Sequence, residues 1–215
     1  MENHTILTGF DNKYNEFERS GIDKLYDQSA YGLFVQDNWY LSPEWSLTSA
    51  LRFDKVEGID SAISPKLSVL YNPDWLDETY LVRASVGRSF HAPTLQELYE
   101  EGYGHGGRAL RYGNPNLKPE YAWSYSLGLE TTPDKAVSTN WRVFLTDFDD
   151  MIVPVYEQNL GANDLWRREN IADATVHGAE VGLRWNINEN LKFNTGYTFT
   201  DNQRDDTDGQ LPYSP

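Results

Sequence analysis

The sequence predicts an all-β protein, in which about nine to ten strands form an antiparallel, up-and-down sheet of the kind found in transmembrane β-barrels. Three observations lead to this prediction. Apolar and polar residues alternate with a period of two in one segment after another, which is typical of strands. The segments are roughly ten residues long, the length that a tilted strand needs to cross a hydrocarbon layer. Short and long connections also alternate, so that the short turns would lie at one end of the sheet and the long loops at the other.

The first five strands are predicted before residue 89. Residues 5–10 are the first, and the polar, charged residues 11–28 that follow are predicted to be a loop. A turn at residues 42–44 joins the second strand to the third. The apolar positions of the second to fifth strands are Tyr31, Leu33, Val35, Trp39 and Leu41; Trp45, Leu47, Leu51 and Phe53; Ile63, Pro65, Leu67, Val69 and Tyr71; and Tyr80, Val82, Ala84 and Val86.

Four more strands are predicted after residue 120. The polar residues 131–137 and 188–190 form short turns, whereas residues 154–170 are predicted to be a second sizeable loop. No segment predicts a long helix. The apolar positions of these strands are Tyr121, Trp123, Tyr125, Leu127 and Leu129; Trp141, Val143 and Leu145; His177, Ala179, Val181, Leu183 and Trp185; and Leu191, Phe193, Tyr197 and Phe199.

The two faces of the predicted sheet differ in a way that favours a barrel over a soluble β-sandwich, whose strands also alternate. Sandwich strands are commonly shorter, and sandwich loops need not segregate by length. The polar face carries small residues and the charge pairs Arg52/Asp54 and Glu180/Arg184, which suit a crowded aqueous interior. Aromatic residues gather at the short-turn end, as in the interfacial girdle of a membrane barrel: Trp39, Tyr40, Trp45, Tyr71, Trp75, Tyr80, Trp141 and Trp185.

Composition excludes several classes of protein. The chain has 215 residues with a net charge of −15, which argues against a nucleic-acid binder. No apolar run reaches the 18 or so residues of a spanning helix, but a barrel stays polar on average because only every second residue faces lipid. There is no cysteine, so disulfides are excluded. No GxSxG or HExxH motif is present, and we expect no enzyme.

Residues 89–120 are the longest predicted connection, well beyond the usual length of a hairpin loop. The loop is rich in tyrosine and leucine, which a solvated linker would not carry. Prolines stiffen it, and glycines at 102, 104, 106 and 107 let it bend. Aromatic, imidazole and guanidinium groups on an ordered loop indicate a ligand-capturing segment.

Two motifs in this loop resemble a known family. Phe90, His91, Ala92 and Pro93, with residues 95–99 (LQELY), are followed by residues 114–120 (NPNLKPE). Together they are similar to the paired FRAP and NPNL boxes of TonB-dependent outer-membrane receptors. The resemblance runs from about residue 26 to the C-terminus; His91 departs from it, because the family usually has Arg or Lys there. It implies a gated barrel that imports iron-siderophores, haem or cobalamin across the bacterial outer membrane.

The resemblance implies a ligand site in this loop. His105 is similar in position to an axial iron ligand of haem receptors. Alternatively, His105 is a solvated loop histidine without a ligand role. Arg108 and Arg111 are expected to clamp carboxylates of a siderophore or haem propionates, unless they serve only loop solubility and internal ion pairs. Tyr103 and Tyr112 are expected to stack on a flat ligand or to pack the loop. His91 is the last predicted ligand-binding residue. Alternatively, it has a structural role near the barrel mouth.

Further expectations concern partners and completeness. Full receptors of this family have more strands and an N-terminal plug that meets TonB, and residues 1–215 are expected to be one partial barrel domain without that plug. The expected partners are outer-membrane lipid, the TonB complex through the missing plug, and an iron chelate or haem, which would be cargo rather than cofactor. No signal peptide opens the chain, which suggests a processed form or an excerpt. A soluble β-sandwich or lectin-like module using the same loop, and a barrel enzyme, remain as alternatives.

Overall fold

The computed structural model describes residues 3–18, 24–73, 79–103, 109–134, 136–159, 164–171 and 173–204, of which residues 103, 133, 134 and 204 are described by their backbone alone. Within these ranges nine strands form one antiparallel sheet in the order β1-β2-β3-β4-β5-β8-β9-β12-β13. The bounds of these strands are β1 (His4–Glu18), β2 (Leu25–Tyr40), β3 (Trp45–Val56), β4 (Ala62–Tyr71), β5 (Tyr80–His91), β8 (Glu120–Asp134), β9 (Val137–Asp149), β12 (Ala174–Asn188) and β13 (Leu191–Arg204). The up-and-down sheet and its nine main strands are confirmed.

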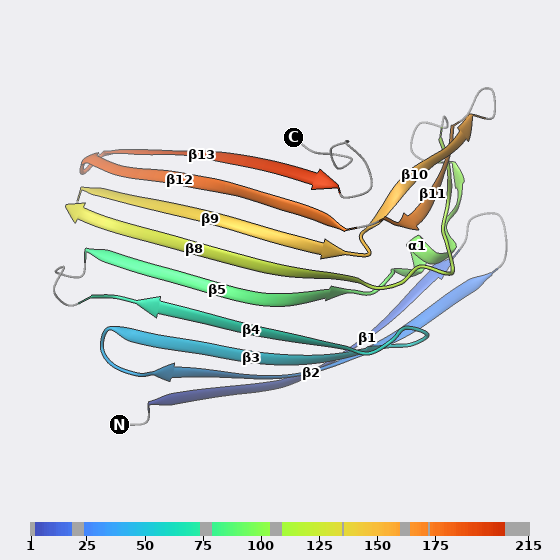
Figure 1. Ribbon diagram of the computed structural model, residues 1–215, viewed down its shortest axis with the longest axis horizontal. Helices are drawn as coiled ribbons and strands as arrows, with labels where there is room; N and C mark the ends of the chain where they lie inside the picture. The colour runs from blue at the N-terminus through green and yellow to red at the C-terminus, as the bar shows by residue number, and fades with distance from the viewer. Residues whose placement is uncertain are drawn as a thin grey trace.

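The sheet is an open wall with β1 at one edge and β13 at the other (Figure 1). The short turns lie at one end, on the left of the view, and the long connections at the other end. A second sheet, a short helix and the chain segments between them stand at this long-loop end. The sheet is open along these two edges within the described residues, whereas a complete barrel has no edge.

The apolar face of the wall is exposed. Leu33, Leu51 and Leu127 expose 55%, 49% and 53% of their surface, where a sandwich would bury them between two sheets. Trp141 exposes 54% on the same face. The chain therefore has the surface of a membrane-barrel wall, and the sandwich alternative is wrong. No helix in the described ranges is long and apolar enough to cross a membrane, a finding that does not bear on crossing by strands.

The polar face carries ion pairs between neighbouring strands. Arg52 bonds Asp11 of β1 at 2.7 Å and Asp54 of its own strand at 2.6 Å. A Cβ at Gly32 would lie 2.1 Å from the guanidinium of Arg52, so the small residue leaves room for the arginine.

One predicted charge pair is wrong. The structure pairs Glu180 with Arg142, which lies directly opposite it on β9, at 3.4 Å, and not with Arg184. The physical reason is spacing. Residues four apart on one strand are separated by about 13 Å, whereas residues opposite each other on neighbouring strands lie about 5 Å apart.

Two segments that were predicted to be loops contain strands. Within residues 11–28, β1 continues to Glu18 and β2 begins at Leu25, with fifteen residue pairs in register from His4↔Trp39 to Glu18↔Leu25. Within residues 154–170 lie most of β10 (Ile152–Asn159) and all of β11 (Asp164–Asn170). Apolar and polar residues do not alternate regularly in these strand portions, so the period-two contrast that marks a strand is lost. The strand predicted to run to about Val153 ends at Asp149, where Asp150 takes a positive φ of 57°.

Candidate functional site

The helix α1 (Leu95–Tyr99) opens the long connection between β5 and β8, and the first box builds its N-terminus. Thr94 is the N-cap: its hydroxyl accepts the Glu97 N–H at 3.2 Å, while the Glu97 carboxylate accepts the Thr94 N–H at 2.9 Å. This reciprocal capping box satisfies two helix donors. Pro93 before it is fully buried, and Leu95 and Leu98 anchor the helix on its inner side. The box therefore fixes where the loop leaves the wall.

His91 ends β5 between two carboxylates. Its Nε2 lies 3.4 Å from Glu97 of α1 and 3.9 Å from Glu120 at the start of β8. The hydrogen bond to Glu97 raises the pKa of His91 above its ordinary value. Burial by itself would raise the pKa of Glu97, but the hydrogen bonds from His91 and Thr94 outweigh it and lower that pKa to about 2. Burial raises the pKa of Glu120, which also accepts the Ile152 N–H.

The second box forms a turn that packs against α1. Asn114 Oδ1 accepts the Asn116 N–H at 3.0 Å, and its carbonyl accepts the Leu117 N–H at 3.2 Å. A Cβ on Gly113 would lie 2.6 Å from the α1 backbone, so only glycine fits there. Leu117 is buried in a small core with members from both long connections, namely Leu98 and Ile152 with Tyr99 beside them. The two boxes thus meet each other in space.

A second sheet joins the two long connections. Its order is β10-β11-β7-β6, where β6 is Glu101–Tyr103 and β7 is Ala109–Tyr112. The parallel pairing of β7 with β11 links residues 92–119 to residues 150–173. The end of Figure 1 that carries β10, β11 and α1 shows this sheet rising from the rim of the wall. The two connections therefore form one body.

Asn170 bonds the two connections at their base. Its Nδ2 donates to the carbonyl oxygens of Lys118 at 3.0 Å and Asp150 at 2.6 Å, and its Oδ1 accepts the Lys118 N–H at 2.8 Å. One side chain thus satisfies three backbone groups from two segments. No pattern in the sequence pointed to this residue.

The structure describes only some of the predicted site residues. His105 and Arg108 lie outside the described residues, and Tyr103 is described by its backbone in β6 alone. Arg111 is exposed and Tyr112 is partly buried, and as consecutive residues of β7 they point to opposite faces of the second sheet. The ligand roles of these residues and of His91 stay predictions.

Other residues next to Arg111 were missed. Trp166 of β11 lies directly opposite Arg111, and Tyr156 of β10 lies opposite Trp166, with the two aromatic rings edge to face at a centroid distance of 5.6 Å. Arg168 follows on the same strand. The run of tryptophan and arginines at 166–168 was the available signal, but it fell in a segment that was predicted to be a loop.

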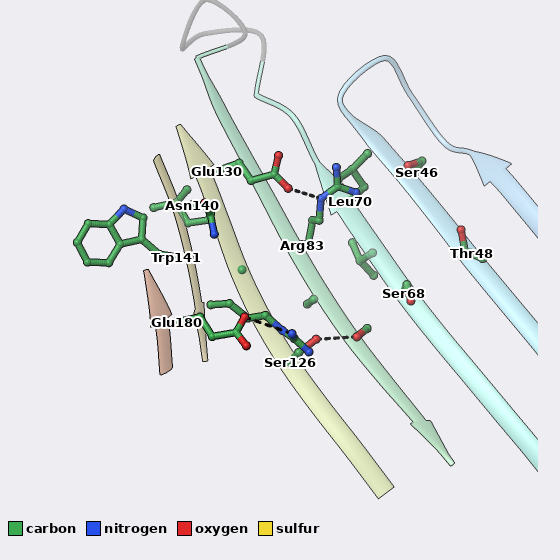
Figure 2. Close-up of a pocket in the computed structure, with 16 residues that line it drawn as sticks. Ser46, Thr48, Ser68, Leu70, Arg83, Ser126, Glu130, Asn140, Trp141 and Glu180 are labelled. Atoms are coloured by element: carbon green, nitrogen blue, oxygen red, sulfur yellow. Dashed lines mark hydrogen bonds and ion pairs between the residues drawn. The ribbon is translucent and has the colours of Figure 1, made fainter. Parts of the chain in front are cut away.

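A hollow of about 460 Å³ lies on the wall and is lined by residues of β3, β4, β5, β8, β9 and β12. Figure 2 shows Arg83 joined to Glu130, at 2.9 Å, whereas Trp141 points away from the polar side chains. Ser126 bonds Ser85 at 2.8 Å. These groups satisfy one another across strands, so the hollow is a polar interior surface rather than a reactive site. Among the described side chains no group of three or more His, Asp or Glu could hold a metal ion.

Comparison with known proteins agrees with this architecture. The family model described as TonB dependent receptor-like, beta-barrel matches residues 3–215. The chain is 27% identical to the iron-regulated outer membrane virulence protein of Vibrio cholerae serotype O1, over 94% of this chain and 32% of that protein. It is 30% identical to the ferric enterobactin receptor PirA of Pseudomonas aeruginosa, over 85% of this chain and 26% of that protein.

Solved structures share the fold. The siderophore receptor PirA from Pseudomonas aeruginosa superposes with a TM-score of 0.79 at 24% identity, covering 94% of this chain and 40% of that one. The copper transporter OprC gives a TM-score of 0.78 at 17% identity, covering 99% and 38%.

The exposed apolar wall and the alternating turns define an outer-membrane β-barrel portion. The chain belongs to the TonB-dependent receptor family, as a part of its β-barrel domain. This is a family of transport receptors and not of enzymes. The chain spans about a quarter to a third of the length of the two curated relatives named above.

Proposed function

We propose that the protein to which this chain belongs takes up an iron chelate through the outer membrane, and that the loop of residues 89–120 helps to capture it. Residues 1–215 would then be one partial barrel domain. The single observation that supports this role is the second sheet, which ties the predicted capture loop to residues 150–173 as one body at the barrel rim. Relatives named as ferric enterobactin receptors and as an iron-regulated outer membrane protein favour iron as the cargo.

Uptake of this kind needs two partners. The exposed apolar face of the wall would contact outer-membrane lipid, and its charged and polar face would enclose the path of the cargo. The energy for release would come from TonB acting through a plug domain. Cells that make the intact receptor should bind an iron chelate with or without TonB, but should accumulate radioactive iron only with TonB. Accumulation that is equal in the two strains would contradict the proposal.

Haem is the second candidate cargo, and His105 is the residue that favours it. An imidazole nitrogen binds iron well, and this histidine lies between the two boxes. Titration of the intact receptor with haem, followed through the Soret band, tests this. His105→Ala should weaken haem binding if the imidazole is a ligand. Unchanged affinity would remove His105 as a ligand and would favour a siderophore.

A further inference from the structure

Three neighbouring strands of the wall place a cation, an indole ring and a carboxylate side by side on the apolar face. Arg88 of β5 lies directly opposite Trp123 of β8, and Trp123 lies directly opposite Asp147 of β9. Because side chains two residues apart share a face of a strand, Trp123 lies on the same face as the exposed Leu127, four residues along β8. We call Arg88, Trp123 and Asp147 the outer row.

The outer row lies at the level of the lipid head groups. Arg88 is eight residues from Tyr80 at the short-turn end of β5, which is about 26 Å along the strand and roughly 20 Å across a membrane when the strand tilts by about 40°. The apolar band of a membrane barrel is about 25 Å tall, and aromatic residues border it at both ends. Because the long loops of such barrels are extracellular, the outer row meets the outer leaflet. Two aromatic pairs mark this level on β5 and β8: Phe90 with Tyr121, and Trp123 with Tyr125.

Arg88 contacts a ring but no carboxylate within the described residues. Its guanidinium carbon lies 3.9 Å from the centre of the Tyr121 ring. Arg83, on the polar face of the same strand, pairs instead with Glu130 at 2.9 Å. A ring does not accept the paired hydrogen bonds that a carboxylate accepts, so the N–H fork of Arg88 is available to anionic oxygens from the membrane.

An apolar groove of about 430 Å³ lies on the same face, toward the short-turn end. Leu127, which lines it, is about 13 Å from Trp123 along β8, and an acyl chain spans about 15 Å, half of a 30 Å hydrocarbon layer. The groove also contains the small Ala179, which lies between Val143 and Phe199 in the cross-strand register. A lipid whose head group sits on the outer row therefore reaches the groove with its acyl chain.

We propose that the outer row and the groove bind a phosphorylated glycolipid of the outer leaflet. Arg88 holds the phosphate through its planar fork, and the indole face of Trp123 carries the sugar ring. Asp147 Oδ1 accepts the Thr175 hydroxyl at 3.1 Å, and its other oxygen accepts a sugar hydroxyl. Two strand spacings, about 10 Å, separate Arg88 from Asp147, which leaves room for the ring over Trp123. A phospholipid has the phosphate and the acyl chains but no sugar ring for Trp123 and Asp147.

Native mass spectrometry of the intact receptor in detergent tests the site with three probes: monophosphoryl lipid A, the same lipid with its phosphate removed, and phosphatidylglycerol. We expect monophosphoryl lipid A to bind about 10-fold more tightly than either of the others. Arg88→Gln should raise its Kd about 10-fold, because a charge-assisted hydrogen bond is lost, and should leave the Kd of the dephosphorylated lipid unchanged. Trp123→Leu should weaken both glycolipids about fivefold and leave phosphatidylglycerol unchanged.

Arg83→Gln is the matched control. It removes an arginine from the same strand, but from the polar face, where its exposed pair with Glu130 contributes little. The Kd for monophosphoryl lipid A should stay within about twofold of wild type. Heat-modifiable migration on gels shows that every variant is folded.

The outcomes decide each part of the inference. Equal affinity for the phosphorylated and dephosphorylated glycolipids, an Arg88→Gln variant that binds like wild type, or an equal loss in Arg83→Gln would show that Arg88 holds no phosphate and would overturn the site. Phosphatidylglycerol binding as tight as that of monophosphoryl lipid A would overturn the glycolipid as its occupant. The site lies on the lipid face of the wall, so these results are independent of which cargo the receptor carries.

Discussion

His91 is a titratable residue at the point where residues 92–119 leave the wall. Two carboxylates approach it from two elements, Glu97 of α1 and Glu120 of β8, and Glu16 of β1 lines a common hollow with His91. His91 remains 48% exposed at its side chain, so its ion pairs are partly screened by water. The ion pairs of His91 with Glu97 and Glu120 nevertheless connect α1 to the ends of β5 and β8. These ion pairs are stronger when the imidazole is protonated and positively charged.

The pH dependence of this contact has a definite sign. Because the folded pKa of His91 lies above its ordinary 6.5, its contribution is fully present below pH 6.5 and is lost as pH rises through the folded value. Glu97 has a lowered pKa of about 2, so it stays charged throughout this range. We expect proteolysis within residues 92–119 to become faster as pH rises from about 6 to 8.5, and His91→Gln to be insensitive to pH.

His4→Gln is the control, because His4 lies at the other end of the sheet and pairs with Asp37 at 2.8 Å. Its cleavage profile should match wild type once the protease's own pH profile is subtracted. A wild-type loop that is cleaved at the same corrected rate at every pH would show that His91 does not hold α1.

At the scale of elements, the two signature boxes act as structural parts. One box caps α1, the other forms the turn beneath it, and both contribute to the small core of Leu98, Leu117 and Ile152. They set the base on which the second sheet stands.

Asn170 should control whether the two long connections move together. Asn170→Ala leaves carbonyls of Lys118 and Asp150 without their donor, at a cost of about 1–3 kcal/mol. Because the loss is local, we expect faster hydrogen exchange in β10, β11 and residues 114–119, with β2 and β3 unchanged. Exchange followed by mass spectrometry measures this.

Asn116→Ala is the comparison variant, since the structure gives the side chain of this exposed residue no hydrogen bond within the described ranges. Its exchange should equal that of wild type. If Asn170→Ala exchanges no faster than Asn116→Ala, the amide does not couple the two connections.

At the scale of the whole molecule, the wall separates an exposed apolar face from a polar face with satisfied ion pairs. Within the described residues β1 and β13 are the two edges of the sheet, and lipid offers no hydrogen bonds to the backbone of an edge strand. The wall is therefore stable in a membrane only as part of a closed barrel.

An arginine on the apolar face should destabilise the barrel. Leu33→Arg, near the middle of β2, is expected to cost about 2–4 kcal/mol if this position lies at the bilayer centre. Gln36→Arg on the polar face of the same strand should cost less than about 1 kcal/mol, because that face is wet. Denaturant unfolding of the intact receptor in lipid vesicles gives both values. Equal losses would mean that the apolar face does not meet lipid.

The sequence by itself determined the wall. Two-residue alternation sets which face of each strand is apolar, and short turns pair each strand with its neighbour, so nine strands and their order followed without coordinates. The two family boxes lie in the longest predicted connection, and so they indicated the long-loop end of the sheet as the place to look for a site. The strand continuations in residues 11–28 escaped this reasoning because apolar and polar residues do not alternate regularly in them.

Only the tertiary structure decided what the loops do together. Asn170 and Lys118 are 52 residues apart in sequence, and no local pattern specifies that they meet. The same holds for Arg111 and Trp166, which become neighbours through the parallel pairing of β7 with β11. Such pairing depends on where the wall places the ends of β5, β8, β9 and β12, and that placement is a property of the assembled sheet and not of any one segment.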